Sequence, residues 1–106
     1  MLGPAAKTHG PDLRARLLAL EPAAYKEFIE FFGPRLAAFY QRRGLTASEA
    51  DELARSAIAD IALKIRFHQS VDEKTFDGWV FTLGRHALMD WWRSRRIAPG
   101  SFDELT

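Results

Sequence analysis

The stretch FDGWVFTLGRHALMDWWRSRR, residues 76–96, decides the fold, because its apolar and basic side chains recur at three- and four-residue intervals. One face carries the apolar residues Phe76, Trp79, Val80, Leu83, Ala87 and Trp91. The opposite face carries Thr82, Arg85, His86, Met89, Arg93 and Arg96. The pattern predicts an amphipathic helix from Phe76 to about Arg96, capped by Thr75 and ended by Pro99-Gly100, with aromatic anchors inside and a basic row outside.

A second long helix is predicted to follow Thr46. Thr46 and Glu49 match the Thr-x-x-Glu capping box, in which each side chain bonds to the backbone N–H of the other. Apolar residues then follow at helical spacing: Ala50, Leu53, Ala54, Ala57, Ile58, Ile61, Ala62 and Ile65. The segment FHQSVDEKT, residues 67–75, lacks this period and is predicted to form the loop between the two helices.

A third long helix is predicted to begin at Glu21-Pro22, because proline is well tolerated in a first turn. Its apolar stripe is formed by Tyr25, Phe28, Ile29, Phe32, Leu36, Phe39 and Tyr40. Gly33-Pro34 in its middle predicts a kink, since proline removes a backbone donor and crowds the preceding turn. Gly44 is predicted to form the C-cap.

A short leading helix, Leu13 to Leu20 with Asp12 as its cap, completes the set. No segment alternates like a strand, so the sequence predicts an all-α bundle of three main helices plus this short leading helix. Residues 1–11, with two prolines and two glycines, are expected to form a loose arm. The helical domain is placed at residues 12–97, and residues 98–106 are assigned to a linker.

The composition is that of a small soluble globular protein. The chain has 106 residues, 47% of them hydrophobic and 27% charged, with a net charge of +1. It contains no cysteine, which fits a reducing cytoplasm. No apolar run approaches the roughly 20 residues of a membrane span, and the N-terminus lacks the layout of a signal peptide. Nothing demands a dimer, so a monomer is expected.

The sequence offers no catalytic or metal-binding motif. His9, His68 and His86 are too scattered for metal ligands, and no histidine and carboxylate lie at a spacing useful for catalysis. The chain is therefore expected to be a binding module rather than an enzyme, without a cofactor. Arg93, Arg95 and Arg96 suit a phosphate-binding row, but they also suit a helix C-terminus, where positive charge is favourable.

Asp90 and Trp92 of the last helix need separate interpretation. Asp90 lies among arginines and is expected to form an intramolecular salt bridge, because a lone acid would repel phosphate. Trp92 points away from Trp91 and either packs on the leading helix or contacts a partner.

Three segments together resemble region 2 of bacterial sigma factors, of the small extracytoplasmic-function (ECF) type of the sigma-70 family. They are YKEFIEFFGPRLAAFYQRRG, ASEADELARSAIADIALKI and TFDGWVFTLGRHALMDWWRSRR, in the order and at the spacings of that family. The resemblance covers about residues 13–96. It implies a transcription initiation factor domain that docks on the clamp of the largest subunit of the RNA polymerase core. It also implies recognition and melting of the promoter −10 element, with capture of the non-template strand.

The resemblance carries two sets of site residues onto this chain. The polymerase-binding set is Glu52, Arg55, Ser56, Ala59, Asp60 and Leu63. The DNA-binding set is Phe67, His68, Ser70, Thr82, Arg85, His86, Met89, Arg93 and Arg96. In this scheme the loop from residue 67 to 75 and the face with His86 hold a flipped base, and the arginines follow the strand.

Departures from the family pattern leave alternatives open. Arg55-Ser56 stands where family members typically carry Gln-Glu, and His86 and Thr82 stand where they often carry Asn and Arg. The chain could therefore be a sigma-like interaction domain that has lost polymerase or DNA binding, and an anti-sigma protein is a further candidate partner. SFDELT resembles the start of the linker to region 4, so the chain is expected to be an excised domain.

Overall fold

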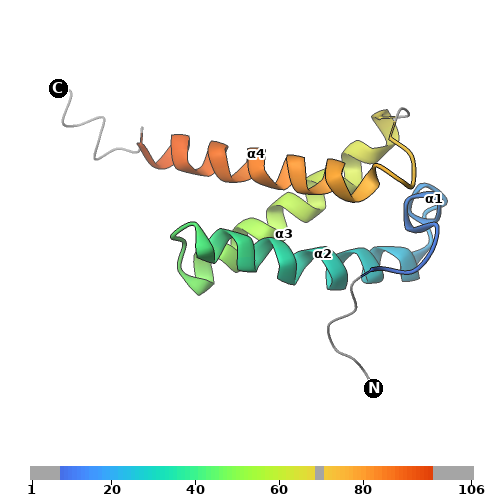
Figure 1. Cartoon of the computed structure of the whole chain (residues 1–106), viewed down its shortest axis with the longest axis horizontal. Coiled ribbons are helices and arrows are strands. Elements are labelled where there is room, and N and C mark those ends of the chain that lie inside the picture. The colour runs from blue at the N-terminus through green and yellow to red at the C-terminus, as the bar shows by residue number, and fades with distance from the viewer. Residues whose placement is uncertain (1–7, 69–70, 97–106) are drawn as a thin grey trace, which may run out of the picture.

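The computed structural model describes residues 8–68 and 71–96, and for Arg96 only the backbone. Four α-helices and one 3₁₀ turn follow each other along the chain (Figure 1). They are α1 (Leu13–Leu18), α2 (Pro22–Arg42), α3 (Ala47–Lys64), η1 (Ile65–Phe67) and α4 (Phe76–Arg96). Within the described residues there is no strand, and the predicted all-α fold with three main helices and a short leading one is confirmed.

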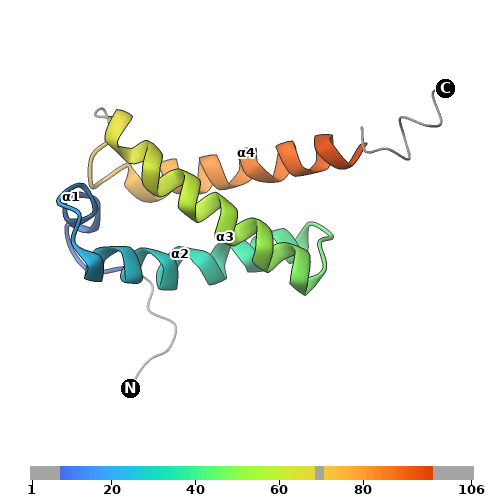
Figure 2. The same ribbon diagram turned by 180° about the vertical axis from the view of Figure 1, so that it is seen from behind.

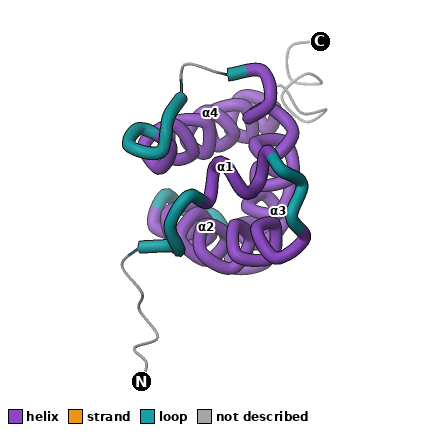
Figure 3. Tube along the Cα trace, turned by 90° about the vertical axis from the view of Figure 1, so that its right-hand side faces the viewer, coloured by secondary structure: helices purple, strands orange, loops and turns teal. Residues whose placement is uncertain are grey.

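The three long helices pack in two layers. Helices α2 and α4 run side by side in the same direction, and α3 crosses behind them on its return path (Figures 1 and 2). Viewed from the end, α1 lies beside the start of α2 and faces the start of α4 (Figure 3). The far end, where α2 and α4 finish, is occupied by the turn from α2 into α3.

Local sequence signals explain the end of α2 and the start of α3. The capping box forms: the Glu49 N–H donates to the Thr46 hydroxyl at 3.1 Å, and the Thr46 N–H donates to the Glu49 carboxylate at 2.9 Å. Gly44 has a φ of 105°, and the N–H of Leu45 returns to the Tyr40 carbonyl at 3.1 Å, as in a Schellman C-cap. Both predictions are confirmed.

Two other predicted caps are wrong. Asp12 adopts the left-handed conformation at the start of α1 without a side-chain cap bond, and α1 ends at Leu18 rather than Leu20. The Thr75 hydroxyl is bonded to the backbone N–H of Asp72 at 3.1 Å, and it is the Thr75 carbonyl that accepts the N–H of Trp79. The Asp72 carboxylate in turn accepts the Thr75 N–H, which lowers the pKa of Asp72. This reciprocal pair stabilises the turn before α4.

Helix α2 runs from Pro22 to Arg42 with Pro34 inside it, and the kink predicted at Gly33-Pro34 stays a prediction. Pro34 lies on the exposed side of the helix. The Glu30 carbonyl, four residues earlier, loses its helical partner there. Glu30 is an exposed residue, so water can replace the missing hydrogen bond.

A phenylalanine cluster forms the centre of the core. Phe32 is fully buried, and its ring centroid lies 5.1 Å from that of Phe28, 6.0 Å from Phe76 and 5.5 Å from Phe81. These rings come from α2 and from the first turns of α4. Aromatic pairs at such distances add to the hydrophobic gain of burial, so the cluster fixes how the two helices meet.

Gly84 marks the closest approach of α4 to α2. A Cβ atom added at Gly84 would lie 2.5 Å from Cδ2 of Leu36. The buried Tyr40 hydroxyl donates to the Gly84 carbonyl at 2.7 Å, and burial raises the pKa of Tyr40 to about 12. The missing side chain at Gly84 therefore lets a hydrogen bond join the two helices through the core.

The described residues just before α1 pack against the helices, whereas most of the predicted loose arm lies outside the described residues. The His9 ring lies among Phe31, Phe32 and Phe76, with centroid distances of 5.1, 5.7 and 6.1 Å. Its Nε2 lies 2.7 Å from the Asp77 carboxylate of α4. Next to it, the Gly10 N–H donates to the Glu27 carboxylate. The division of the chain at residue 11 stays a prediction.

His9 should make the stability of the fold depend on pH. Burial lowers the pKa of His9, but bonds to the Gly10 carbonyl and Asp77, with the charges of Asp77 and Glu27, outweigh it and raise the pKa above 6.5. Because the pKa of His9 is higher in the folded state, protonated His9 contributes its full stabilisation of the fold below pH 6.5. This stabilisation is lost as the pH rises through the folded-state pKa. The Glu27 carboxylate is also paired with Arg16, at 2.9 Å.

The check is thermal unfolding by circular dichroism between about pH 6 and pH 8.5 for the unmodified chain and His9→Gln. The unmodified chain should lose Tm over this interval by more than the variant does. Equal pH dependence in both would contradict the assignment, whatever their absolute Tm values.

Candidate functional site

An apolar groove of about 950 Å³ lies between α2 and α3. Its walls include Tyr25, Phe28, Ile29, Gly33, Pro34, Ala54, Ile58, Ala59, Ala62 and Leu63. Two of the large apolar side chains are well exposed, Ile29 at 50% and Leu63 at 65%. Glu30, Asp51 and Arg55 supply its charged groups. A concave apolar surface with a few charges is typical of a protein-binding site.

The groove brings together half of the predicted polymerase-binding set. Arg55, Ala59 and Leu63 line it, whereas Glu52, Ser56 and Asp60 are exposed on α3 outside its lining. The Arg55 guanidinium is paired with the Asp51 carboxylate at 2.7 Å, and Asp60 with Lys64 at 2.9 Å. Both pairs are solvent-exposed, so they add little stability and can be exchanged for contacts to a partner.

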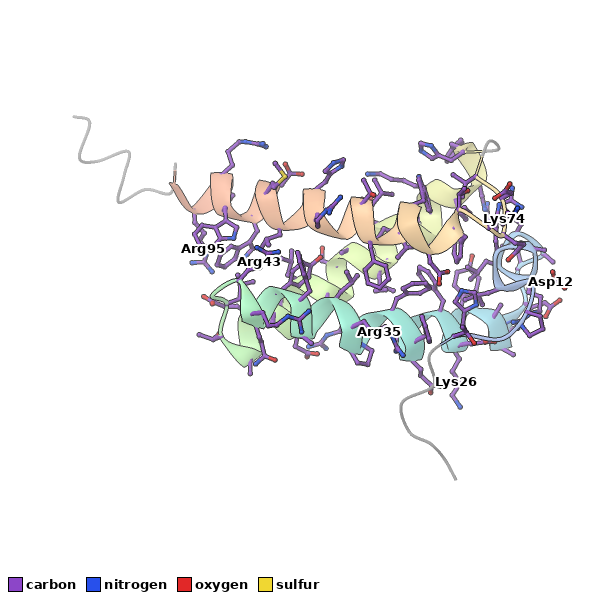
Figure 4. All side chains as sticks on the ribbon, in the orientation of Figure 1. Asp12, Lys26, Arg35, Arg43, Lys74 and Arg95 are labelled. Carbon is purple, nitrogen blue, oxygen red and sulfur yellow. The ribbon has the colours of Figure 1, made fainter. Side chains whose placement is uncertain are left out.

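The exposed side of α4 carries the predicted DNA-binding residues of that helix. Arg85, His86 and Met89 are exposed, and Thr82 is half-buried. A second pocket, of about 400 Å³, adjoins this side and is lined by Phe39, Arg43, Arg85, His86, Leu88 and Met89. Arg43 therefore reaches from the end of α2 toward the face of α4 (Figure 4). A pocket with cationic and apolar walls can take an anion attached to a flat apolar group.

The end of α4 mixes exposed and tethered basic residues. Arg93 is paired with Asp90 at 2.7 Å, which confirms the predicted salt bridge of Asp90. Arg95 lies 4.5 Å from the Trp91 ring centroid and 3.5 Å from the Glu49 carboxylate, so it links α4 to the first turn of α3. The side chain of Arg96 is outside the described residues.

Trp92 is 45% exposed and lies near Gly44 in the turn between α2 and α3. The leading helix α1 is at the other end of the molecule (Figure 1), so the reading in which Trp92 packs on it is wrong.

The 3₁₀ turn η1 and the loop that follows it present an exposed aromatic side chain. Phe67 is 80% exposed, whereas the His68 ring lies 5.2 Å from the ring of Trp79. Val71 is buried and anchors the loop to the core. Ser70, the third predicted site residue of this loop, is outside the described residues. Phe67 and His68 thus lie beside the start of α4, and their role in base capture stays a prediction.

Comparison with known proteins finds relatives among the ECF RNA polymerase sigma factors. Over 94 residues the chain is 31% identical to the ECF RNA polymerase sigma factor SigF of Caulobacter vibrioides, covering 81% of this chain and 51% of that protein. It is 28% identical over 76 residues to the ECF RNA polymerase sigma factor RpoE of Cereibacter sphaeroides, covering 72% of this chain and 41% of that protein. The chain resembles ECF sigma factors over most of its length.

This likeness confirms the resemblance derived from the three helical segments. The chain spans about half the length of the curated sigma factors that it matches, 51% and 41%. No protein-family model and no solved structure matches it. These relatives agree with the prediction that the chain is not an enzyme. No helix in the described part of the chain is long and apolar enough to cross a membrane.

The sequence reasoning missed the contribution of α2 to both surfaces. Phe39 was assigned to the core stripe and Arg43 to no site, yet both line the pocket against α4. Ile29 was also assigned to the core and is half exposed in the groove. A signal existed, because Phe31, Arg35, Phe39 and Arg43 are spaced by four residues and alternate aromatic and cationic side chains.

Proposed function

We propose that the chain is a transcription initiation factor domain that binds the RNA polymerase core and recognises and melts the promoter −10 element. The groove between α2 and α3 would receive the clamp of the largest polymerase subunit. The exposed side of α4 and the loop that begins at Phe67 would hold the non-template strand of the promoter. Such a domain works in the cytoplasm, where the polymerase is.

One observation carries the proposal beyond the likeness to ECF sigma factors. The apolar groove and the basic side of α4 border different pairs of helices, α2 with α3 and α2 with α4. A protein and a nucleic acid can therefore be bound at the same time. The chemistry of each surface suits its partner, because apolar side chains predominate in the groove and cationic ones along α4.

A second function is favoured by a specific feature of α3. Arg55-Ser56 replaces the family's Gln-Glu pair, and Arg55 is engaged by Asp51 at the edge of the groove. The alternative is a sigma-like interaction domain that has lost polymerase or DNA binding and uses the same groove for another protein, such as an anti-sigma partner.

The test is capture of purified RNA polymerase core by the immobilised chain, with Arg55→Glu alongside. Retention of the core at micromolar concentration, changed by about threefold or more in the variant, is expected if this face of α3 meets the clamp. Unchanged retention would mean that the core is held elsewhere. No retention of the core by either protein would reject the polymerase role and favour the interaction domain.

A further inference from the structure

Helix α2 carries a row in which aromatic and cationic side chains alternate: Phe31, Arg35, Phe39 and Arg43. The four-residue spacing places all of them on one side of the helix. The guanidinium carbon of Arg35 lies 3.7 Å from the Phe31 ring centroid, and that of Arg43 lies 4.9 Å from the Phe39 ring centroid. Each arginine lies over the aromatic ring one turn before it, and the Arg35 guanidinium also donates to the Phe31 carbonyl at 2.7 Å.

The end of this row closes against α4 to form the pocket of about 400 Å³. Arg43 comes from α2, and Arg85 and His86 come from α4. Phe39, Leu88 and Met89 supply the apolar part of the lining. Figure 4 shows Arg43 at the end of α2, on the side that faces α4. Two helices therefore direct cationic groups into one small, partly apolar space.

The charge of the pocket is unbalanced. No aspartate or glutamate lines it. Among residues 8–68 and 71–96, neither Arg43 nor Arg85 forms an ion pair with a carboxylate, unlike Arg93 and Arg95 further along α4. Arginines that converge without an acid repel each other, and an anion placed between them removes that repulsion. The apolar lining suits an anion that carries an apolar group, which a simple inorganic anion does not have.

We propose that this pocket holds one nucleotide of single-stranded DNA, with its phosphate between Arg43 and Arg85 and its base against Phe39 and Met89. The inference rests on the proposed function and extends the DNA surface from α4 onto α2. Aromatic and guanidinium surfaces accept every base, so the pocket supplies affinity rather than sequence preference.

The first experiment measures binding of a fluorescent oligothymidylate of about 12 nucleotides by anisotropy at several salt concentrations. Arg43→Ala should weaken binding about three- to tenfold and reduce the salt slope by about 0.7, the amount expected for one lost phosphate contact. The matched control is Arg42→Ala, which removes the same charge from the adjacent exposed position outside the pocket. Its effect should stay below about twofold.

A parallel variant, Arg93→Ala, separates the pocket from the DNA role proposed for α4. If Arg93→Ala weakens binding while Arg43→Ala equals Arg42→Ala, the pocket is overturned and the role of α4 stands. If only Arg43→Ala weakens binding, the pocket stands and the role of the α4 arginines fails. If the unmodified chain does not bind the oligonucleotide, the pocket is overturned, and capture of the polymerase core remains a separate test.

A second measurement locates the strand. The chain contains no cysteine, so Met89→Cys introduces a single thiol at the pocket. Saturating oligothymidylate should slow alkylation of that thiol about fivefold, because thiol reactivity follows exposure. The control is Leu63→Cys, whose thiol lies in the groove between α2 and α3 and should react at an unchanged rate. Equal rates with and without the oligonucleotide in the Met89→Cys variant would overturn the proposal.

Discussion

Replacing Gly84 with leucine should lower the free energy of unfolding by about 3 kcal/mol. A Cβ at this position already comes within 2.5 Å of Leu36, and the rest of the side chain would enter a packed core. Overpacking of this kind typically costs about 1–3 kcal/mol. The displaced helix would also lose the hydrogen bond from Tyr40 to the Gly84 carbonyl, worth about 1 kcal/mol. Against a total stability of roughly 5–15 kcal/mol, this is a large fraction.

Gly78 provides the matched control on the same helix. No atom lies within 4 Å of a Cβ added at Gly78, and the residue is exposed. Gly78→Leu should therefore raise stability by about 0.5–1 kcal/mol, because glycine is a poor helix former. Urea denaturation of both variants measures the difference. Similar stabilities for the two would show that α2 and α4 do not approach each other at Gly84.

The elements that the sequence predicts well are those specified by neighbouring residues. The capping box at Thr46 and Glu49 involves residues three positions apart, and the Gly44 cap depends on one backbone conformation. The apolar stripe of α3 likewise follows from its own period, and most of it is buried. Such features need no knowledge of the partner helix, which is why the all-α fold could be predicted.

Features that depend on tertiary contacts were not predictable in the same way. His9 and Asp77 are 68 positions apart, so nothing in the local sequence of either predicts their pairing. Gly84 reads as an ordinary helical glycine until Leu36 and Tyr40 of α2 are placed against it. For the same reason the pocket around Arg43 was missed, because helical periodicity cannot tell which neighbour covers which side.

The candidate site was predicted on α3 and α4 from the resemblance, and its geometry is only partly explained by sequence. Ala59 and Leu63 are the apolar members of the predicted polymerase-binding set, and both line the groove. The other wall of the groove comes from α2, where Gly33 and Pro34 leave space beside Ile29. That shape arises from the crossing of two helices, which the pattern of α3 alone does not specify.

Leu63→Glu should abolish most of the capture of RNA polymerase core without loss of stability. Leu63 is 65% exposed in the free chain, so the substitution removes little burial and leaves the fold intact. In the complex proposed above, the clamp covers the groove and the new carboxylate is buried among its apolar walls. Burying an acid without a partner opposes binding. We therefore expect the affinity for the core to fall by about thirtyfold or more.

The matched control is the same substitution at Leu20, which is 55% exposed and lies in the connection between α1 and α2, outside the groove. Leu20→Glu changes the net charge by the same amount, so it accounts for any general repulsion from the polymerase. Capture of the core and circular dichroism should both be unchanged in this variant. If Leu63→Glu and Leu20→Glu retain the core equally, the clamp does not meet the groove. If both lose it equally, net charge decides, and the polymerase site must be sought on another face of the domain.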